Sequence, residues 1–143
     1  MDLLQLLKYP EGKTLEFKRD LSSPDGILRT VVAFANTSGG VLLIGVEDGT
    51  RHVRGISEPT EAEERLASLI SDAIVPRLLP EIEILPWRHS QVLAVEIYPG
   101  PGRPYYLKRV GIDGGAYVRV GSTNRRADRP LQNAGPAYPT KTG

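Results

Sequence analysis

The chain has 143 residues, of which 40% are hydrophobic and 24% are charged, and this balance suits one globular domain with one core. It contains no cysteine, which excludes disulfides, thiolate zinc sites and cysteine nucleophiles. No apolar run approaches the roughly 20 residues that span a bilayer, and the N-terminus lacks the pattern of a secretion signal. We therefore expect a cytoplasmic protein with no membrane segment.

Charge is distributed unevenly along the chain, although the formal net charge is only +1. The segment 103–129 carries seven basic residues against two acids, a local charge of +5. Such asymmetry is typical of a surface that meets phosphates, although arginines on exposed strands can also serve solubility alone. The basic residues of this segment are Arg103, Lys108, Arg109, Arg119, Arg125, Arg126 and Arg129.

The first half of the chain predicts two main helices and at least two strands. Apolar spacing indicates a short helix at 2–8 and an alternating strand at 14–18. Ser23 and Pro24 are a helix-start signal, and the apolar positions that follow continue to the Asn36–Gly40 segment. The continuous apolar run 41–46 predicts a strand buried on both faces, with 51–56 as its hairpin partner. A second helix is predicted over 60–74, before Pro76.

The second half reads as strands separated by turns. The predicted strands lie at 81–87, 91–98, 104–109 and 116–120. Residues 130–143 carry three prolines and no hydrophobic period, which predicts a disordered tail after a single domain at 1–129. The fold class predicted by this pattern is α+β, with a mixed sheet of six to seven strands and two main helices.

The Gly12-Lys13-Thr14 triplet resembles the end of a phosphate-binding loop but does not have its context. A Walker loop requires glycine at the position that Leu7 occupies, and it lies between a strand and a helix. Here the order of the flanking elements is the reverse. No ATP site is therefore expected in this chain.

Carboxylates lie near two predicted neighbouring strands. Glu16 shares a strand face with Lys18, which predicts a solvated or paired side chain. Glu47 and Asp48 follow the buried strand directly, at a strand end where ligand and catalytic groups gather. Carboxylates there could chelate a divalent cation whose bound water attacks a phosphodiester. The alternative is that these side chains are only exposed surface groups.

Four sequence pieces, in this order, resemble the Schlafen AlbA domain family: LEFKRDL, VVAFANTSGGVLLIGVEDG, PYYLK and AYVRVGSTNRRAD. The resemblance spans residues 11 to 129 and implies a nucleic-acid-binding domain. Bacterial members are generally DNA-binding domains of transcriptional regulators related to RecG-type helicases. Animal relatives include endoribonucleases with an acidic triad, whose positions match Glu11, Glu16 and Asp48 here. Their Cys/His zinc cluster is absent from this sequence, and a single copy of the domain would have to dimerise to build a comparable groove.

Two polar segments, 36–40 and 121–126, can each be explained from their residues alone. Asn36, Thr37 and Ser38 can end the helix, and Gly39-Gly40 can reverse the chain, with a phosphate nest as the alternative. The segment 121–126 offers small donors and two adjacent arginines, which suits backbone phosphates. In the strand before it, Ala116, Val118 and Val120 are expected to face the core. Tyr117 and Arg119 would then face outward.

These observations together predict a DNA-binding module that contacts backbone phosphates, with RNA as the alternative partner and no cofactor. The phosphate-contacting residues are predicted to be Arg103, Lys108, Arg119, Ser122, Thr123, Arg125 and Arg126. The first rival is a nuclease that uses Mg²⁺ or Mn²⁺ bound by Glu11, Glu16 and Asp48. The second rival is a protein-interaction module or homodimer that uses Tyr105, Tyr106 and the N-terminal helix.

Overall fold

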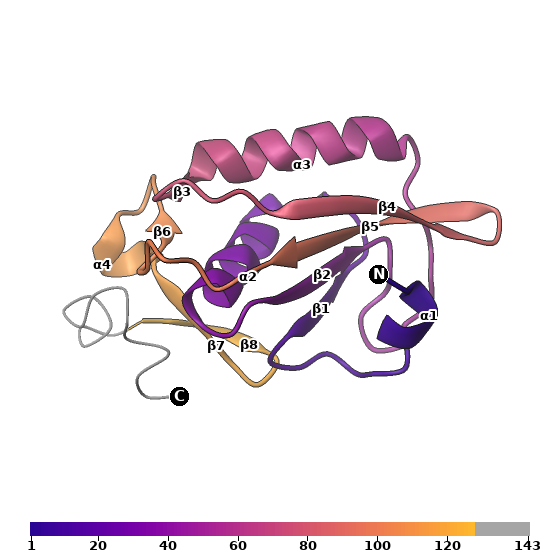
Figure 1. Ribbon diagram of the computed structural model, residues 1–143, viewed down its shortest axis with the longest axis horizontal. Coiled ribbons are helices and arrows are strands. Elements are labelled where there is room, and N and C mark those ends of the chain that lie inside the picture. Colours follow the sequence, from indigo (N-terminus) through magenta and orange to yellow (C-terminus); the bar gives the residue numbers. More distant parts are fainter. Residues whose placement is uncertain (128–143) are drawn as a thin grey trace.

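The computed structural model describes residues 1–127 and confirms an α+β fold. The predicted tail at 130–143 lies outside the described residues, as do Asp128 and Arg129. In chain order the elements are α1 (Leu3–Leu6), β1 (Leu15–Lys18), α2 (Pro24–Asn36), β2 (Gly40–Ile44), α3 (Pro59–Ala73), β3 (Ile74–Val75), β4 (Glu81–Trp87), β5 (Ser90–Ile97), β6 (Tyr106–Leu107), α4 (Ile112–Gly115), β7 (Tyr117–Val120) and β8 (Thr123–Arg126) (Figure 1).

A four-stranded mixed sheet forms the centre of the fold, in the order β1-β2-β5-β4. The β1–β2 pair is parallel because α2 connects the two strands, whereas β5 runs antiparallel to both of its neighbours. Two further pairs, β3–β6 and β7–β8, form small separate sheets. The β7–β8 hairpin lies at the lower side of the molecule in Figure 1, and α3 runs along the upper side.

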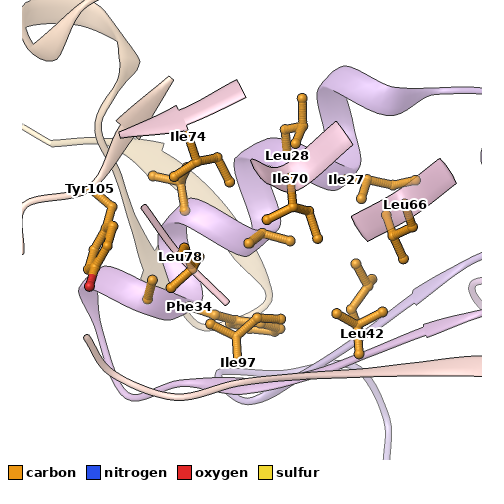
Figure 2. Packing of buried hydrophobic residues seen from close by; sticks show 14 of the residues in the cluster. Ile27, Leu28, Phe34, Leu42, Leu66, Ile70, Ile74, Leu78, Ile97 and Tyr105 are labelled. Carbon is orange, nitrogen blue, oxygen red and sulfur yellow. The ribbon is translucent and has the colours of Figure 1, made fainter. Parts of the chain in front are cut away.

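The central sheet is covered on both faces, which explains the continuous apolar run in β2. Leu42 and Ile44 join the larger core with α2 and α3, whereas Leu43 belongs to the smaller core beneath α1. Figure 2 shows the larger core, where side chains of α2 and α3 meet those of the sheet. Side chains of β1 also alternate between the two faces of the sheet. Phe17 faces the smaller core, and Glu16 therefore faces the side of α2.

Some predicted elements were wrong or missed. The segment 51–56 was expected to pair along β2, but it makes only a single bridge, Val46 to Val53. It cannot pair further because β1 and β5 already occupy both sides of β2. The short elements β3, α4 and β8 were not predicted. Of these, β8 is the most important. The segment 121–126 was predicted to be a loop, and it is instead a turn followed by β8.

The Asn36 side chain links the end of α2 to the second half of the chain through hydrogen bonds. Its side chain is fully buried, and its Nδ2 donates to the carbonyl oxygens of Tyr105 and Tyr117, both at 2.9 Å. Its Oδ1 accepts from the Tyr105 backbone N–H at 2.7 Å. The role of Asn36 is therefore a structural one: α2 ends at this residue, as predicted, and its side chain also bridges distant segments.

The two glycines after α2 permit close approach of the chain. Gly39 has φ of 74°, and a Cβ added there would lie 2.6 Å from the Ile97 carbonyl oxygen. A Cβ on Gly40 would lie 2.8 Å from the Phe34 ring. Both contacts are too short for a side chain, so the Gly-Gly pair is required by packing and backbone conformation.

Candidate nucleic-acid interface

The β7–β8 hairpin presents most of the predicted phosphate ligands on one short unit. The register pairs Val118 with Arg125 and Tyr117 with Arg126. Arg125 and Arg126 are exposed, and Ser122 and Thr123 are exposed at the turn. Within residues 1–127, no carboxylate lies at ion-pair distance from either arginine. The hairpin therefore carries two unneutralised positive charges next to small hydroxyl groups.

Arg119, in contrast, was predicted to contact phosphates and is buried instead, with a residue exposure of 3%. Its guanidinium donates to the carbonyl oxygen of Gly12, at 2.8 Å from Nη2, and to that of Leu15, at 3.2 Å. Nη2 also lies 2.8 Å from Glu16 Oε1, and Nη1 donates to Asn124 Oδ1 at 2.8 Å. These hydrogen bonds hold the Arg119 guanidinium inside the protein.

The faces of β7 are therefore the reverse of the predicted ones. Val120, expected in the core, is 46% exposed, while Arg119 points inward with its guanidinium carbon 5.0 Å from the centroid of the Phe34 ring. A buried arginine is tolerated here because its charge is paired with Glu16 and its N–H groups have carbonyl partners. Arg119 joins β7 to β1 and to β8.

The other two predicted cations lie outside the hairpin. Lys108 follows β6 and is exposed, with no carboxylate partner within residues 1–127, and its neighbour Arg109 pairs with Asp25 of α2 at 3.2 Å. Arg103 is half-buried, and its Nε and Nη1 atoms are enclosed without a hydrogen-bond partner within residues 1–127. Lys108 is thus freely available to a ligand, and Arg103 only in part.

The structure brings the three predicted acidic residues into one neighbourhood. Glu11 Oε2 accepts from the Phe17 backbone N–H at 2.7 Å, at the outer edge of β1. Burial raises the pKa of Glu11 to about 7, and a hydrogen bond to Asp48 and the nearby Glu16 charge act in the same direction. Glu16 and Asp48 line a groove of about 470 Å³ together with Lys18.

This arrangement does not fit the metal site that the family resemblance implies. Glu16 is bound to Arg119 at 2.8 Å and to Lys18 at 3.3 Å, so its two oxygens already have cationic partners. Within residues 1–127, no three acidic or histidine side chains are placed to hold a metal ion together. Of the three carboxylates, Glu16 is an ion-pair partner of Arg119 and Lys18, whereas Glu11 and Asp48 have no basic partner within residues 1–127.

We expect the Glu11→Gln variant to lose a component of the pH dependence of stability. The folded-state pKa of about 7 lies above the ordinary value of 4.5, so the native state binds this proton more tightly than the unfolded state. The free energy of unfolding should then fall as pH rises from about 4.5 to about 7. The effect is on the order of 1 kcal/mol, because the half-exposed carboxyl is screened by water.

Urea unfolding at several pH values measures this component. The matched control is Glu83→Gln, which removes an exposed carboxylate on β4 and should keep the wild-type pH dependence. If Glu11→Gln and wild type showed the same change in unfolding free energy across this range, the assignment of the raised pKa would be wrong.

Of the groups predicted to form a protein-interaction surface, Tyr105 and Leu3 are buried, whereas Tyr106 is half-buried and Leu4 is 59% exposed. Tyr105 is 3% exposed, its hydroxyl accepts from the Gly102 N–H at 3.2 Å, and its backbone is held by Asn36. Leu3 of α1 is likewise buried, in the smaller core. Tyr105 and Leu3 therefore stabilise the domain itself, and a protein-interaction surface would have to use Tyr106 and Leu4. None of the helices within residues 1–127 is long and apolar enough to cross a membrane.

The geometry defines an α+β domain with an exposed basic hairpin anchored to the sheet by a buried arginine. The sequence matches the family described as Schlafen, AlbA_2 over residues 11–128, and the chain belongs to this family. Among the solved structures it resembles is the N-terminal domain of a DNA helicase RecG-related protein from Nitrosomonas europaea. The two share 28% identity with a TM-score of 0.65, over 87% of this chain and 92% of that one.

A second solved structure, the DIP2311 protein from Corynebacterium diphtheriae, shares the fold at 22% identity with a TM-score of 0.64. The match covers 81% of this chain but 22% of that protein, so the domain corresponds to one part of a larger chain there. Family membership and the RecG-related neighbour together support assignment as a nucleic-acid-associated domain.

Proposed function

We propose that this domain binds DNA through its backbone phosphates, with the β7–β8 hairpin as the principal contact. The observation that carries the proposal is the pair of exposed arginines, Arg125 and Arg126, which lack an acidic partner within residues 1–127. Hydroxyl groups of Ser122 and Thr123 lie at the adjoining turn, and such small donors suit phosphate oxygens. The relationship to the N-terminal domain of a DNA helicase RecG-related protein supports the same function.

The number of available cations sets the expected salt dependence. Arg119 is buried and is not available to DNA. The cations that are fully available to phosphates are Lys108, Arg125 and Arg126, and Arg103 is available in part. Three or four phosphate contacts predict that log affinity falls against log salt with a slope of roughly −3 to −4 on duplex DNA. A protein that recognised DNA without phosphate contacts would show almost no salt dependence.

The test compares wild type with the double variant Arg125→Ala, Arg126→Ala in DNA-binding titrations at several salt concentrations. The double variant should bind about tenfold more weakly or worse, with the slope reduced by about two units. The control removes two exposed arginines elsewhere, as Arg65→Ala with Arg88→Asn, because asparagine tolerates the positive φ of 53° at position 88. Equal affinity of the two double variants would contradict the proposal.

An arm of the same experiment with labelled RNA, in Mn²⁺ or in a chelator, tests the nuclease alternative. The informative variants are Glu11→Gln and Asp48→Asn, because neither carboxylate has a basic partner within residues 1–127. Glu16→Gln is unsuitable, since loss of the Arg119 ion pair would also reduce stability. Cleavage that required manganese and was lost in Asp48→Asn would establish an enzyme. Intact, shifted nucleic acid would support the binding function.

A further inference from the structure

The exposed positive charge of the hairpin continues onto α2. Asn124 of β8 donates from Nδ2 to the Thr30 hydroxyl at 2.9 Å, which places this strand beside the first half of the helix. Arg126 lies two residues further along β8 and therefore on the same side of the strand as Asn124. Arg29 directly precedes Thr30 and is partly exposed. β8 therefore packs against α2, and Arg126 and Arg29 belong to the two elements that meet there.

A second cation adjoins Arg29 at the start of α2. Lys18 Nζ and Arg29 Nη2 lie 3.3 Å and 3.9 Å from the position that a Cβ would occupy on Gly26. We call Lys18, Arg29 and Arg126 the basic strip; Arg125 points to the other side of β8. Arg29 has no carboxylate partner within residues 1–127, and Lys18 shares its only one, Glu16, with Arg119. Lys18 also lines the groove that contains Glu16 and Asp48, so the potential that attracts an extended polyanion comes mainly from Arg29 and Arg126.

The exposed aromatic rings lie on the other side of the central sheet. Tyr9 and Tyr98 are 62% and 52% exposed, and both line a groove with Leu15 and Val41, which pack with the smaller core under α1. The groove is lined by one carboxylate, Glu96, and one cation, Lys13, so it lacks the excess of positive charge that attracts a polyanion.

The basic strip itself offers no exposed aromatic ring among the described residues. Phe34 is fully buried beneath Arg119, and Tyr117 is half-buried against the larger core. Proteins that bind single strands combine cations with aromatic rings on which the bases stack. A surface that carries cations alone can follow the paired phosphate backbones of a duplex. The exposed aromatic rings and the exposed cations of this domain lie on different surfaces. The basic strip should therefore favour a duplex over a single strand.

We infer that the basic strip selects double-stranded over single-stranded DNA, and that Arg29 is a phosphate-contacting residue in addition to those of the hairpin. This inference rests on the proposed function and specifies its ligand. It assigns to α2 a part of the interface that neither the local charge of segment 103–129 nor the family match indicates.

Fluorescence anisotropy with a labelled DNA duplex and with each of its separate strands tests the inference at a fixed ionic strength. Wild type should bind the duplex about tenfold more tightly than either strand. Arg29→Ala should weaken duplex binding about threefold to tenfold and reduce the salt slope by about one unit, and Arg29→Lys should restore most of the affinity. The charge-matched control is Arg88→Asn at the β4–β5 turn, at the opposite end of the molecule in Figure 1.

The possible outcomes separate this inference from the proposed function. Equal or tighter binding of single strands, or equal affinities of Arg29→Ala and Arg88→Asn for the duplex, would overturn the inference and leave the binding function in place. No binding of any DNA by wild type would overturn both. Thermal unfolding of each variant completes the comparison. The Arg29→Ala variant should unfold at the same temperature as wild type, because Arg29 has no ion-pair partner within residues 1–127.

Discussion

Replacement of Arg119 by leucine is expected to lower the free energy of unfolding by about 4 kcal/mol, because it leaves the Glu16 carboxylate buried beside an apolar side chain. The carbonyl oxygens of Gly12 and Leu15 would lose their guanidinium donor at the same time. Arg119→Lys should recover only part of this loss, since one ammonium group cannot reproduce the planar fork that reaches several acceptors. Chemical denaturation monitored by circular dichroism measures the effect.

Arg125→Leu on the neighbouring strand is the matched control. Its side chain is exposed and its only hydrogen bond is a long one to Thr123, at 3.4 Å, so the unfolding free energy should change by less than about 0.5 kcal/mol. Arg119→Leu should therefore alter the stability of the domain, whereas Arg125→Leu should alter its affinity for nucleic acid. Equal stability of Arg119→Leu and wild type would show that the buried network does not form in solution.

Asn36→Asp is expected to be similarly destabilising, at about 3 to 5 kcal/mol, although the two side chains have nearly the same shape. The substitution removes the Nδ2 donor and places a buried negative charge against the carbonyl oxygens of Tyr105 and Tyr117. Because Asn36 connects α2 to both segments, the loss should also loosen the attachment of β7. Hydrogen exchange of the β7 amides, together with the unfolding free energy, measures both effects.

Ser38→Ala serves as the control for this position. Ser38 lies two residues further along the same motif but is exposed, and the expected change is within about 0.5 kcal/mol. If Asn36→Asp unfolded at the same denaturant concentration as Ser38→Ala, the buried bridge to Tyr105 and Tyr117 could not contribute to stability as described.

Hydrophobic periodicity predicted the elements that form the two cores. The helix that begins at Pro24, the strand over Leu42–Ile44 and the strands at 81–87 and 91–98 all bury regular apolar patterns, so their positions follow from sequence alone. The missed elements β3 and α4 contain only two and four residues, and packing against the rest of the domain rather than local pattern determines them. Their existence depends on neighbours that are distant in the sequence.

The orientation of β7 could not be predicted by the same rule, for a specific physical reason. Alternation of apolar residues in AYVRV suggests that valines face inward. The hairpin, however, packs beside the edge of β1, where the Gly12 carbonyl oxygen accepts from the Arg119 guanidinium and the buried Glu16 carboxylate needs a cation. Polar complementarity therefore outweighs the apolar pattern. The sequence signal that could have indicated it is the need of an edge strand for hydrogen-bond partners.

The candidate site was predicted in part. Exposure of Arg125, Arg126, Ser122 and Thr123 is as expected from a glycine-containing polar segment, whereas the extension through Arg29 depends on the packing of β8 against α2. The three carboxylates do lie together, but the partner of Glu16 comes from a residue 103 positions away in the chain. Long-range ion pairs of this kind are invisible to local pattern analysis.

The outer edge of β1 has a further consequence for the behaviour of the protein at high concentration. An unpaired strand edge is a template on which a strand from another chain can add, and such addition begins many aggregation processes. Here the Glu11 carboxylate accepts from the Phe17 N–H, and the Arg119 guanidinium donates to the Leu15 carbonyl oxygen. The same two side chains that stabilise the domain therefore block intermolecular sheet growth, and they do so with charged groups that an incoming strand would have to displace.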